Sequence, residues 1–235
     1  MQNKMRFTID KIIFTLAGIF LFTAATAQQH GKVKYLKKDN YGSVYVTKDT
    51  SIREYNWLSV VSFNKEVTSA YTTNYNVVLK DTLVLTKHFS INEKLLLNWT
   101  PLYIYNDNYY VYSPSDWMAH FNYLVNDSAI IEYKTDGPDA MILLDYQELS
   151  SSEFLFKILS YDKVVSELRI KIIDPAKQIT LWIFKSKNYK NNMLIVNGDR
   201  VKEYPMVKCD CNGQKCLLEF EFDKINEEMI SKKGW

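Results

Sequence analysis

Three cysteines near the C-terminal end, Cys209, Cys211 and Cys216, form the densest group of reactive side chains in the sequence. Asn212-Gly213 between them favours a type I′ hairpin turn, in which both central residues need positive φ. With these two residues as the loop, Cys209 lies opposite Cys216, at a Cα separation of about 5.5 Å that a disulfide accepts. We therefore predict a Cys209–Cys216 bridge. Two alternatives stay open: a four-residue loop that places Cys211 opposite Cys216, and a three-thiolate metal site, which lacks an evident fourth ligand.

A second group consists of four tyrosines on a predicted hairpin over residues 102–112. An Asp107-Asn108 turn would place Tyr105 opposite Tyr110 and Tyr103 opposite Tyr112, all on one face. Each tyrosine ring offers an apolar face and a hydroxyl, which suits sugars or an extended peptide. The predicted ligand-binding residues are therefore Tyr103, Tyr105, Tyr110 and Tyr112. The alternative is a purely structural ladder of rings packed beneath a loop or a helix.

Glycine and histidine are too sparse for the common catalytic motifs. The seven glycines are never closer than eleven residues apart, so a G-x-G-x-x-G turn, a P-loop and a G-x-S-x-G elbow are all excluded. The three histidines, His30, His88 and His120, do not have the spacing of a zinc site. We predict no catalytic residue, no metal site and no cofactor. Carboxylates are plentiful, so a hydrolase that uses two of them is the catalytic alternative.

The N-terminal residues have the three-part order of a secretory signal peptide. Lys4, Arg6 and Lys11 precede an apolar run, and Ala25-Thr26-Ala27 is a typical cleavage site. We predict a signal peptide over residues 1–27 and a mature chain of residues 28–235 with no transmembrane helix. The whole chain has a formal charge of +2, and the signal carries the same +2, so the mature chain is near neutral. Nucleic acid is therefore not an expected partner.

Alternating and short apolar segments dominate the mature chain and predict a mostly β protein. We expect an antiparallel β-sandwich or open barrel with one or two short helices. Asp174-Pro175-Ala176-Lys177 should reverse the chain between strands at 164–173 and 179–184. Helices are predicted from Ser115 to about Asn126 and over Lys224–Lys232. The first of these could divide two β subdomains near residues 113–128.

These observations together favour an exported, non-catalytic module of the cell envelope or surface that binds a glycan, a peptide or a partner protein. The alternatives are a secreted carboxylate-dependent hydrolase and a purely structural component of an envelope assembly. The expected location is the periplasm, the cell surface or the extracellular space.

Overall fold

The structure, a computed structural model, describes residues 33–59, 73, 76, 87–96, 98–116, 119–134, 137–160, 162–211 and 220–235. The predicted signal peptide and Cys216 lie outside these residues. The described strands are β1 (Lys34–Lys38), β2 (Gly42–Thr47), β3 (Asn98–Tyr105), β4 (Asn108–Ser113), β5 (Phe121–Val125), β6 (Ala129–Lys134), β7 (Gly137–Ser150), β8 (Glu153–Leu159), β9 (Val165–Asp174), β10 (Ile179–Lys185), β11 (Lys190–Asn197) and β12 (Met206–Cys211). The described helices are α2 (Arg53–Ser59), α4 (Glu227–Lys233) and the 3-10 helices η1 (Glu93–Leu95) and η3 (Gly198–Glu203).

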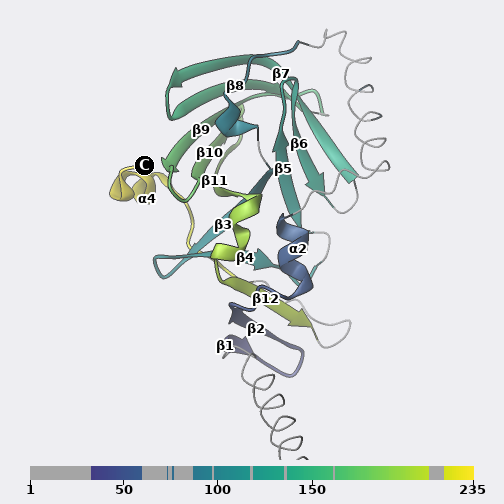
Figure 1. Ribbon diagram of the computed structural model, residues 1–235, viewed down its shortest axis with the longest axis vertical. Helices are drawn as coiled ribbons and strands as arrows, with labels where there is room; N and C mark the ends of the chain where they lie inside the picture. The colour runs from purple at the N-terminus through teal and green to yellow at the C-terminus, as the bar shows by residue number, and fades with distance from the viewer. Residues whose placement is uncertain are drawn as a thin grey trace, which may run out of the picture.

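Eight of these strands close into an antiparallel barrel (Figure 1). Strands β5 to β11 follow one another as a meander, and β3 closes the ring because it pairs with both β11 and β5. The prediction of a mostly β, antiparallel fold is confirmed, with the barrel as the architecture. The remaining strands continue the sheet away from β3 in the order β4, β12, β2 and β1.

The barrel interior is filled with side chains. Each of the eight barrel strands contributes at least one residue to a single buried cluster, which includes Trp99, Tyr123, Phe154, Phe156 and Trp182. Trp182 contacts Trp99 at a ring separation of 6.2 Å and Tyr123 at 5.2 Å. This packing makes the interior a hydrophobic core rather than a ligand cavity.

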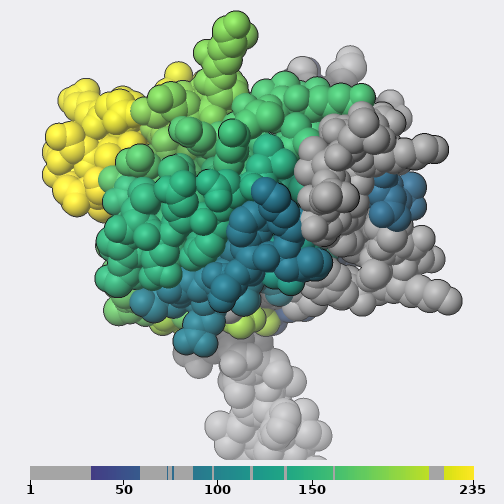
Figure 2. All heavy atoms as spheres, turned by 90° about the horizontal axis from the view of Figure 1, so that it is seen from above, coloured from purple at the N-terminus to yellow at the C-terminus, as the bar shows by residue number. Residues whose placement is uncertain are grey.

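The residues before β3 cover part of this core. Ile91 and Leu95 belong to the interior cluster, and the Trp99 indole N–H donates to the Leu95 carbonyl at 3.0 Å. The Phe89 amide donates to the Asp127 carbonyl at 2.8 Å, which ties the segment to the turn between β5 and β6. In Figure 2 the segment around η1, in blue, lies against the green barrel strands.

A second buried cluster lies on the outer face of β3, β10 and β11. Leu181 faces it, whereas the adjacent Trp182 faces the barrel interior, as the alternation of a strand requires. Helices α2, η3 and α4 cover this outer face with Tyr55, Val201 and Ile230. The hydroxyl of Tyr55 donates to the Tyr204 carbonyl at 2.8 Å, which satisfies its polar end inside the cluster.

The sequence-based elements are confirmed in part. The reversal at Asp174–Lys177 links β9 to β10, and α4 matches the predicted C-terminal helix. The helix predicted from Ser115 to Asn126 is wrong, because residues 121–125 form β5. That segment fits a strand as well as a helix: Tyr123 and Val125 alternate into the barrel core, and pairing with β3 and β6 outweighs a weak helical periodicity. At residues 113–128, β4 ends at Ser113 and β5 follows within the stretch, and both strands pair with β3.

Candidate functional site

The predicted tyrosine hairpin exists, with a register that differs by two residues. Its turn is Asn106-Asp107, with φ values of 49° and 61°, so Tyr103 lies opposite Tyr110 and Tyr105 lies opposite Asn108. The predicted pairs Tyr105–Tyr110 and Tyr103–Tyr112 are therefore wrong. Both turns offer residues that tolerate left-handed angles, and the bond from Asn108 Nδ2 to the Asn106 carbonyl at 2.7 Å supports the observed one. Because a slip of two residues preserves parity, the four tyrosines still share one face.

The C-terminal segment, which we define as residues 220–226, packs against this tyrosine face. Phe222 lies 4.5 Å from Tyr103 and 5.0 Å from Tyr112 between ring centroids, and Phe220 lies 4.9 Å from Tyr105. Each of the four tyrosines is only partly exposed. The hairpin rings therefore belong to a packed aromatic cluster, and their role in ligand binding stays a prediction.

Burial affects the hydroxyl groups of two tyrosines in this cluster, Tyr103 and Tyr112. Burial raises the pKa of Tyr103 to about 12. Burial is also the largest cause of a raised pKa at Tyr112, whose hydroxyl lies 3.4 Å from the Cys209 sulfur and 3.4 Å from the Phe220 amide, which donates to it. Both phenols are therefore protonated at neutral pH.

The cysteines on β12 differ from each other in surroundings. Cys209 is 5% exposed and packs in a small core with Val44 and Val207, and it is not part of a disulfide. Cys211, at the exposed end of the strand, is disulfide-bonded. No two described cysteines are bonded to each other. The Cys209–Cys216 prediction conflicts with the unbridged state of Cys209, whereas Cys216 itself lies outside the described residues.

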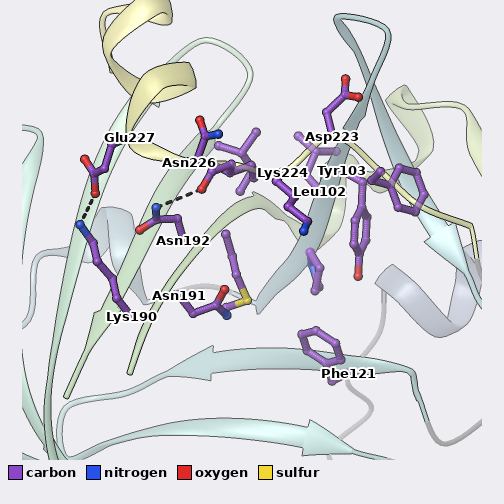
Figure 3. Close-up of a pocket in the computed structure, with 15 residues that line it drawn as sticks. Leu102, Tyr103, Phe121, Lys190, Asn191, Asn192, Asp223, Lys224, Asn226 and Glu227 are labelled. Atoms are coloured by element: carbon purple, nitrogen blue, oxygen red, sulfur yellow. Dashed lines mark hydrogen bonds and ion pairs between the residues drawn. The ribbon is translucent and has the colours of Figure 1, made fainter. Parts of the chain in front are cut away.

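A groove opens where β3 leaves the barrel, between β3 and β11 (Figure 3). The two strands pair only from Trp99 to Leu102, so the first residues of β11 extend beyond the last pair. The C-terminal segment crosses this gap: the Asp223 amide donates to the Ile104 carbonyl at 2.9 Å, and Asn192 Nδ2 donates to the Ile225 carbonyl at 3.0 Å. The resulting cavity, which we call the β3–β11 groove, has a volume of about 590 Å³.

Aromatic rings and side-chain amides line this groove together. The residues that provide them are Tyr103, Phe121, Phe222, Asn191, Asn192 and Asn226. The charged lining residues are balanced, since Lys190 pairs with Glu227, and Lys224 and Asp223 carry one charge of each sign. Asn191 is partly exposed in the groove and makes no side-chain hydrogen bond within the described residues. The groove can therefore stack an apolar ring face and exchange hydrogen bonds without selecting for charge.

Sequence reasoning found one of these groove residues, Tyr103, and missed the others. Asn191, Asn192 and Asn226 form no spacing motif, because they come from β11 and the start of α4, which meet only in the folded chain.

Among the described residues, no group of three or more His, Cys, Asp or Glu side chains is placed to hold a metal ion. None of the helices in this part of the chain is long and apolar enough to cross a membrane.

Comparison of the chain with protein-family models, with curated proteins and with solved structures found no match in any of the three. The class of the protein thus follows from its own architecture: an antiparallel eight-stranded barrel with a solid core, a lateral sheet extension and an amide- and aromatic-lined groove between them.

Proposed function

We propose that this protein is an exported, non-catalytic binding module of the cell envelope or surface, and that the β3–β11 groove holds a neutral segment of a glycan. The observation that supports the proposal is the groove lining: amides, aromatic rings and balanced charges around a cavity of about 590 Å³. Ligand sites of proteins commonly have volumes in this range and combine apolar walls with a few polar groups. Sugars need both kinds of contact, because each ring has an apolar face and a rim of hydroxyls.

The groove is better suited to this task than the tyrosine face from which the sequence argument began. Phe220 and Phe222 pack against three of the four tyrosines, whereas Asn191 and Lys224 reach the groove from two different segments. Figure 3 shows Lys224, Asn191 and Phe121 around the same space. A sugar bound in the groove would replace water at the side-chain amides of the groove, and it would not displace the packed rings of the tyrosine face.

Replacing Asn191 by alanine should weaken glycan binding about fivefold to thirtyfold, since one or two hydrogen bonds worth about 1 kcal/mol each are lost. The measurement is calorimetric titration of the mature chain with a neutral oligosaccharide selected on a glycan array. Asn188→Ala is the matched control, because Asn188 is exposed in the β10–β11 turn and does not line the groove. Both variants should keep the parent melting temperature.

Two results would contradict this proposal: no glycan on the array binds, or Asn188→Ala and Asn191→Ala weaken binding equally. The hydrolase alternative is favoured by the two carboxylates in the groove, Asp223 and Glu227. It predicts that the selected oligosaccharide is shortened on incubation and that Asp223→Asn stops the shortening. The structural alternative predicts instead that the chain co-purifies with one envelope protein and retains no glycan.

We also propose that the exported protein begins at Gln28 and carries a Cys211–Cys216 bridge. The support for the bridge is the disulfide-bonded state of Cys211 and the buried setting of Cys209 beside Tyr112. Peptide mapping of the exported protein by mass spectrometry, without reduction, should recover this cystine, a Gln28 N-terminus and an alkylatable Cys209 after denaturation. A retained Met1 would refute the export proposal, and a Cys209–Cys216 cystine would restore the pairing expected from the hairpin register.

A further inference from the structure

A second cavity, which we call the lysine pocket, lies where four distant parts of the chain meet. Its walls come from β1 and β2 with the residue after β2, from the start of β4, from the β9–β10 turn and from the residues between η3 and β12, and its volume is about 540 Å³. Three lysines and three tyrosines line it: Lys34, Lys48, Lys177, Tyr109, Tyr110 and Tyr204. The lining that the structure describes includes no Asp or Glu. The pocket is therefore positively charged, in contrast to the balanced β3–β11 groove.

Within the described residues, Lys177 alone of the three lysines has a carboxylate partner. Lys177 lies 3.5 Å from Asp174, the last residue of β9. Lys34 and Lys48 are exposed and form no ion pair with any described residue. Even with Asp174 counted, the described lining keeps an excess of positive charge, which lies on Lys34 and Lys48.

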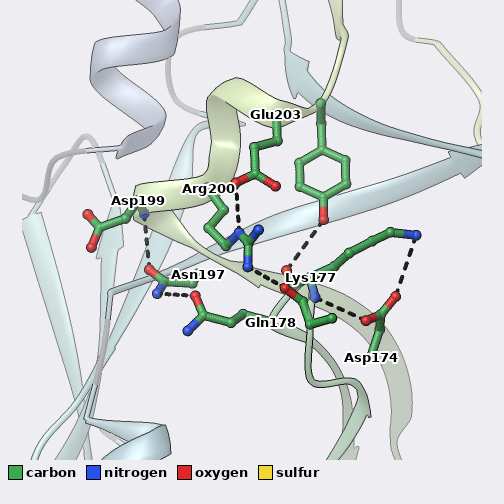
Figure 4. A network of polar contacts seen from close by, with 9 residues as sticks. Asp174, Lys177, Gln178, Asn197, Asp199, Arg200 and Glu203 are labelled. Carbon is green, nitrogen blue, oxygen red and sulfur yellow. Dashed lines mark hydrogen bonds and ion pairs between the residues drawn. The ribbon is translucent and has the colours of Figure 1, made fainter.

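One wall of the lysine pocket is held by a polar network (Figure 4). The Lys177 amide donates to Asp174 Oδ1 at 3.0 Å, and Arg200 pairs with Glu203 and donates to the Ala176 carbonyl. The Tyr204 hydroxyl donates to the Lys177 carbonyl at 3.5 Å. These contacts fix the turn and the Tyr204 ring without using the ammonium groups of Lys34 and Lys48.

The three tyrosines of the lysine pocket provide apolar ring faces and hydroxyl donors beside the lysines. Burial raises the pKa of Tyr109, and it raises the pKa of Tyr204 to about 12, so both phenols stay protonated at neutral pH. The Tyr109 and Tyr204 rings meet edge to face at 6.4 Å, which defines an aromatic wall. The hydroxyls of Tyr109 and Tyr110 make no hydrogen bond within the described residues.

We propose that the lysine pocket binds an acidic saccharide, whose carboxylate pairs with Lys34 and Lys48 and whose ring lies against the tyrosine wall. Lysine supplies the charge, and aromatic faces with phenol donors match the two surfaces of a sugar ring. A purely acidic peptide would use the charge but not the aromatic wall. This site is separate from the β3–β11 groove and does not depend on the function proposed there.

The test is calorimetric titration of the mature chain with hexameric galacturonate at low salt. The same hexamer with every carboxylate methyl-esterified is the neutral control. Lys34→Gln/Lys48→Gln should weaken galacturonate binding about tenfold, because two exposed charge pairs are lost. Lys157→Gln/Lys185→Gln removes the same charge from exposed positions outside the pocket and should change the affinity less than twofold. The titrations are made in the Asn191→Ala background, so that a hexamer bound in the β3–β11 groove does not contribute to the measured affinity.

Binding should also weaken as salt rises from 50 to 500 mM, since exposed charges are screened. The proposal is overturned if hexagalacturonate does not bind, if the esterified hexamer binds equally well, or if the two double variants behave alike. Equal affinity for a hexaglutamate peptide would show that charge alone is recognised and would refute the saccharide class.

Discussion

Replacing Trp182 by alanine is expected to lower the free energy of unfolding by about 3–5 kcal/mol, the largest single effect that we expect in the barrel. Trp182 is fully buried and contacts Trp99, Tyr123 and Phe184. Its removal would leave a large cavity among rings that are held by eight hydrogen-bonded strands and cannot collapse freely. Urea unfolding at neutral pH, followed by far-UV circular dichroism, measures this loss.

Two conservative replacements give the matched control. The Trp182 indole N–H is buried and has no hydrogen-bond partner in the described part of the chain, whereas the Trp99 indole N–H donates to the Leu95 carbonyl. Trp182→Phe relieves an unsatisfied donor, while Trp99→Phe breaks a hydrogen bond and leaves an acceptor unpaired. Trp99→Phe should therefore be more destabilising, by about 1–2 kcal/mol. The reverse order would mean that the Trp182 donor is satisfied.

The protein should lose stability steeply between pH 10 and pH 12. Tyr103 has a folded pKa of about 12, raised by burial, against an ordinary value of 10.0. Above pH 10 the unfolded chain releases this phenolic proton and the folded chain does not, so stability present below pH 10 is lost as the pH rises toward 12. A shift of two units corresponds to about 3 kcal/mol from Tyr103 alone. Tyr55 and Tyr204, each with a pKa of about 12, add in the same direction.

Tyr103→Phe isolates this contribution, because it keeps the ring against Phe222 and removes only the hydroxyl. The variant should be nearly as stable as the parent at pH 8. Between pH 10 and pH 12 it should lose about 2 kcal/mol less, measured by urea unfolding at each pH, with tyrosinate absorbance at 295 nm as the second signal. Lysine titration in the same range affects both proteins and cancels in the comparison. Identical pH profiles would show that Tyr103 ionises freely in the folded protein.

Much of the secondary structure could be read from local pattern. The strands around Asp174–Lys177 and the C-terminal helix appear near their expected positions. Asn226 accepts from the Met229 amide, and Gly234 ends the helix with a φ of 69°, so both ends of α4 follow ordinary capping chemistry. The pattern of residues 121–125 led to a wrong helix prediction. Five residues cannot distinguish the helical period of 3.6 from the strand period of 2 when both leave apolar side chains on one face.

The candidate sites were likewise predictable only in part. The shared face of the four hairpin tyrosines was predictable, because side chains alternate with period two whatever strand lies opposite. Their exact partners were not, because both candidate turns satisfy the local backbone and differ only in distant contacts. The covering of the tyrosines by Phe220 and Phe222 depends on a segment more than 100 residues away. The position of Cys209 beside Tyr112 likewise joins residues 97 apart in the chain.

The fold class, the facial alternation and the absence of glycine-rich catalytic motifs thus follow from residue types and spacing alone. Barrel closure, the groove and the lysine pocket were decided only in three dimensions. β3 closes the barrel through β11 and β5 and then turns away to pair with β4, and this divergence opens the groove that the C-terminal segment crosses. The physical reason is that a strand's alternation is a local steric property, whereas its choice of partner depends on the burial and hydrogen bonds gained by residues far apart in the chain.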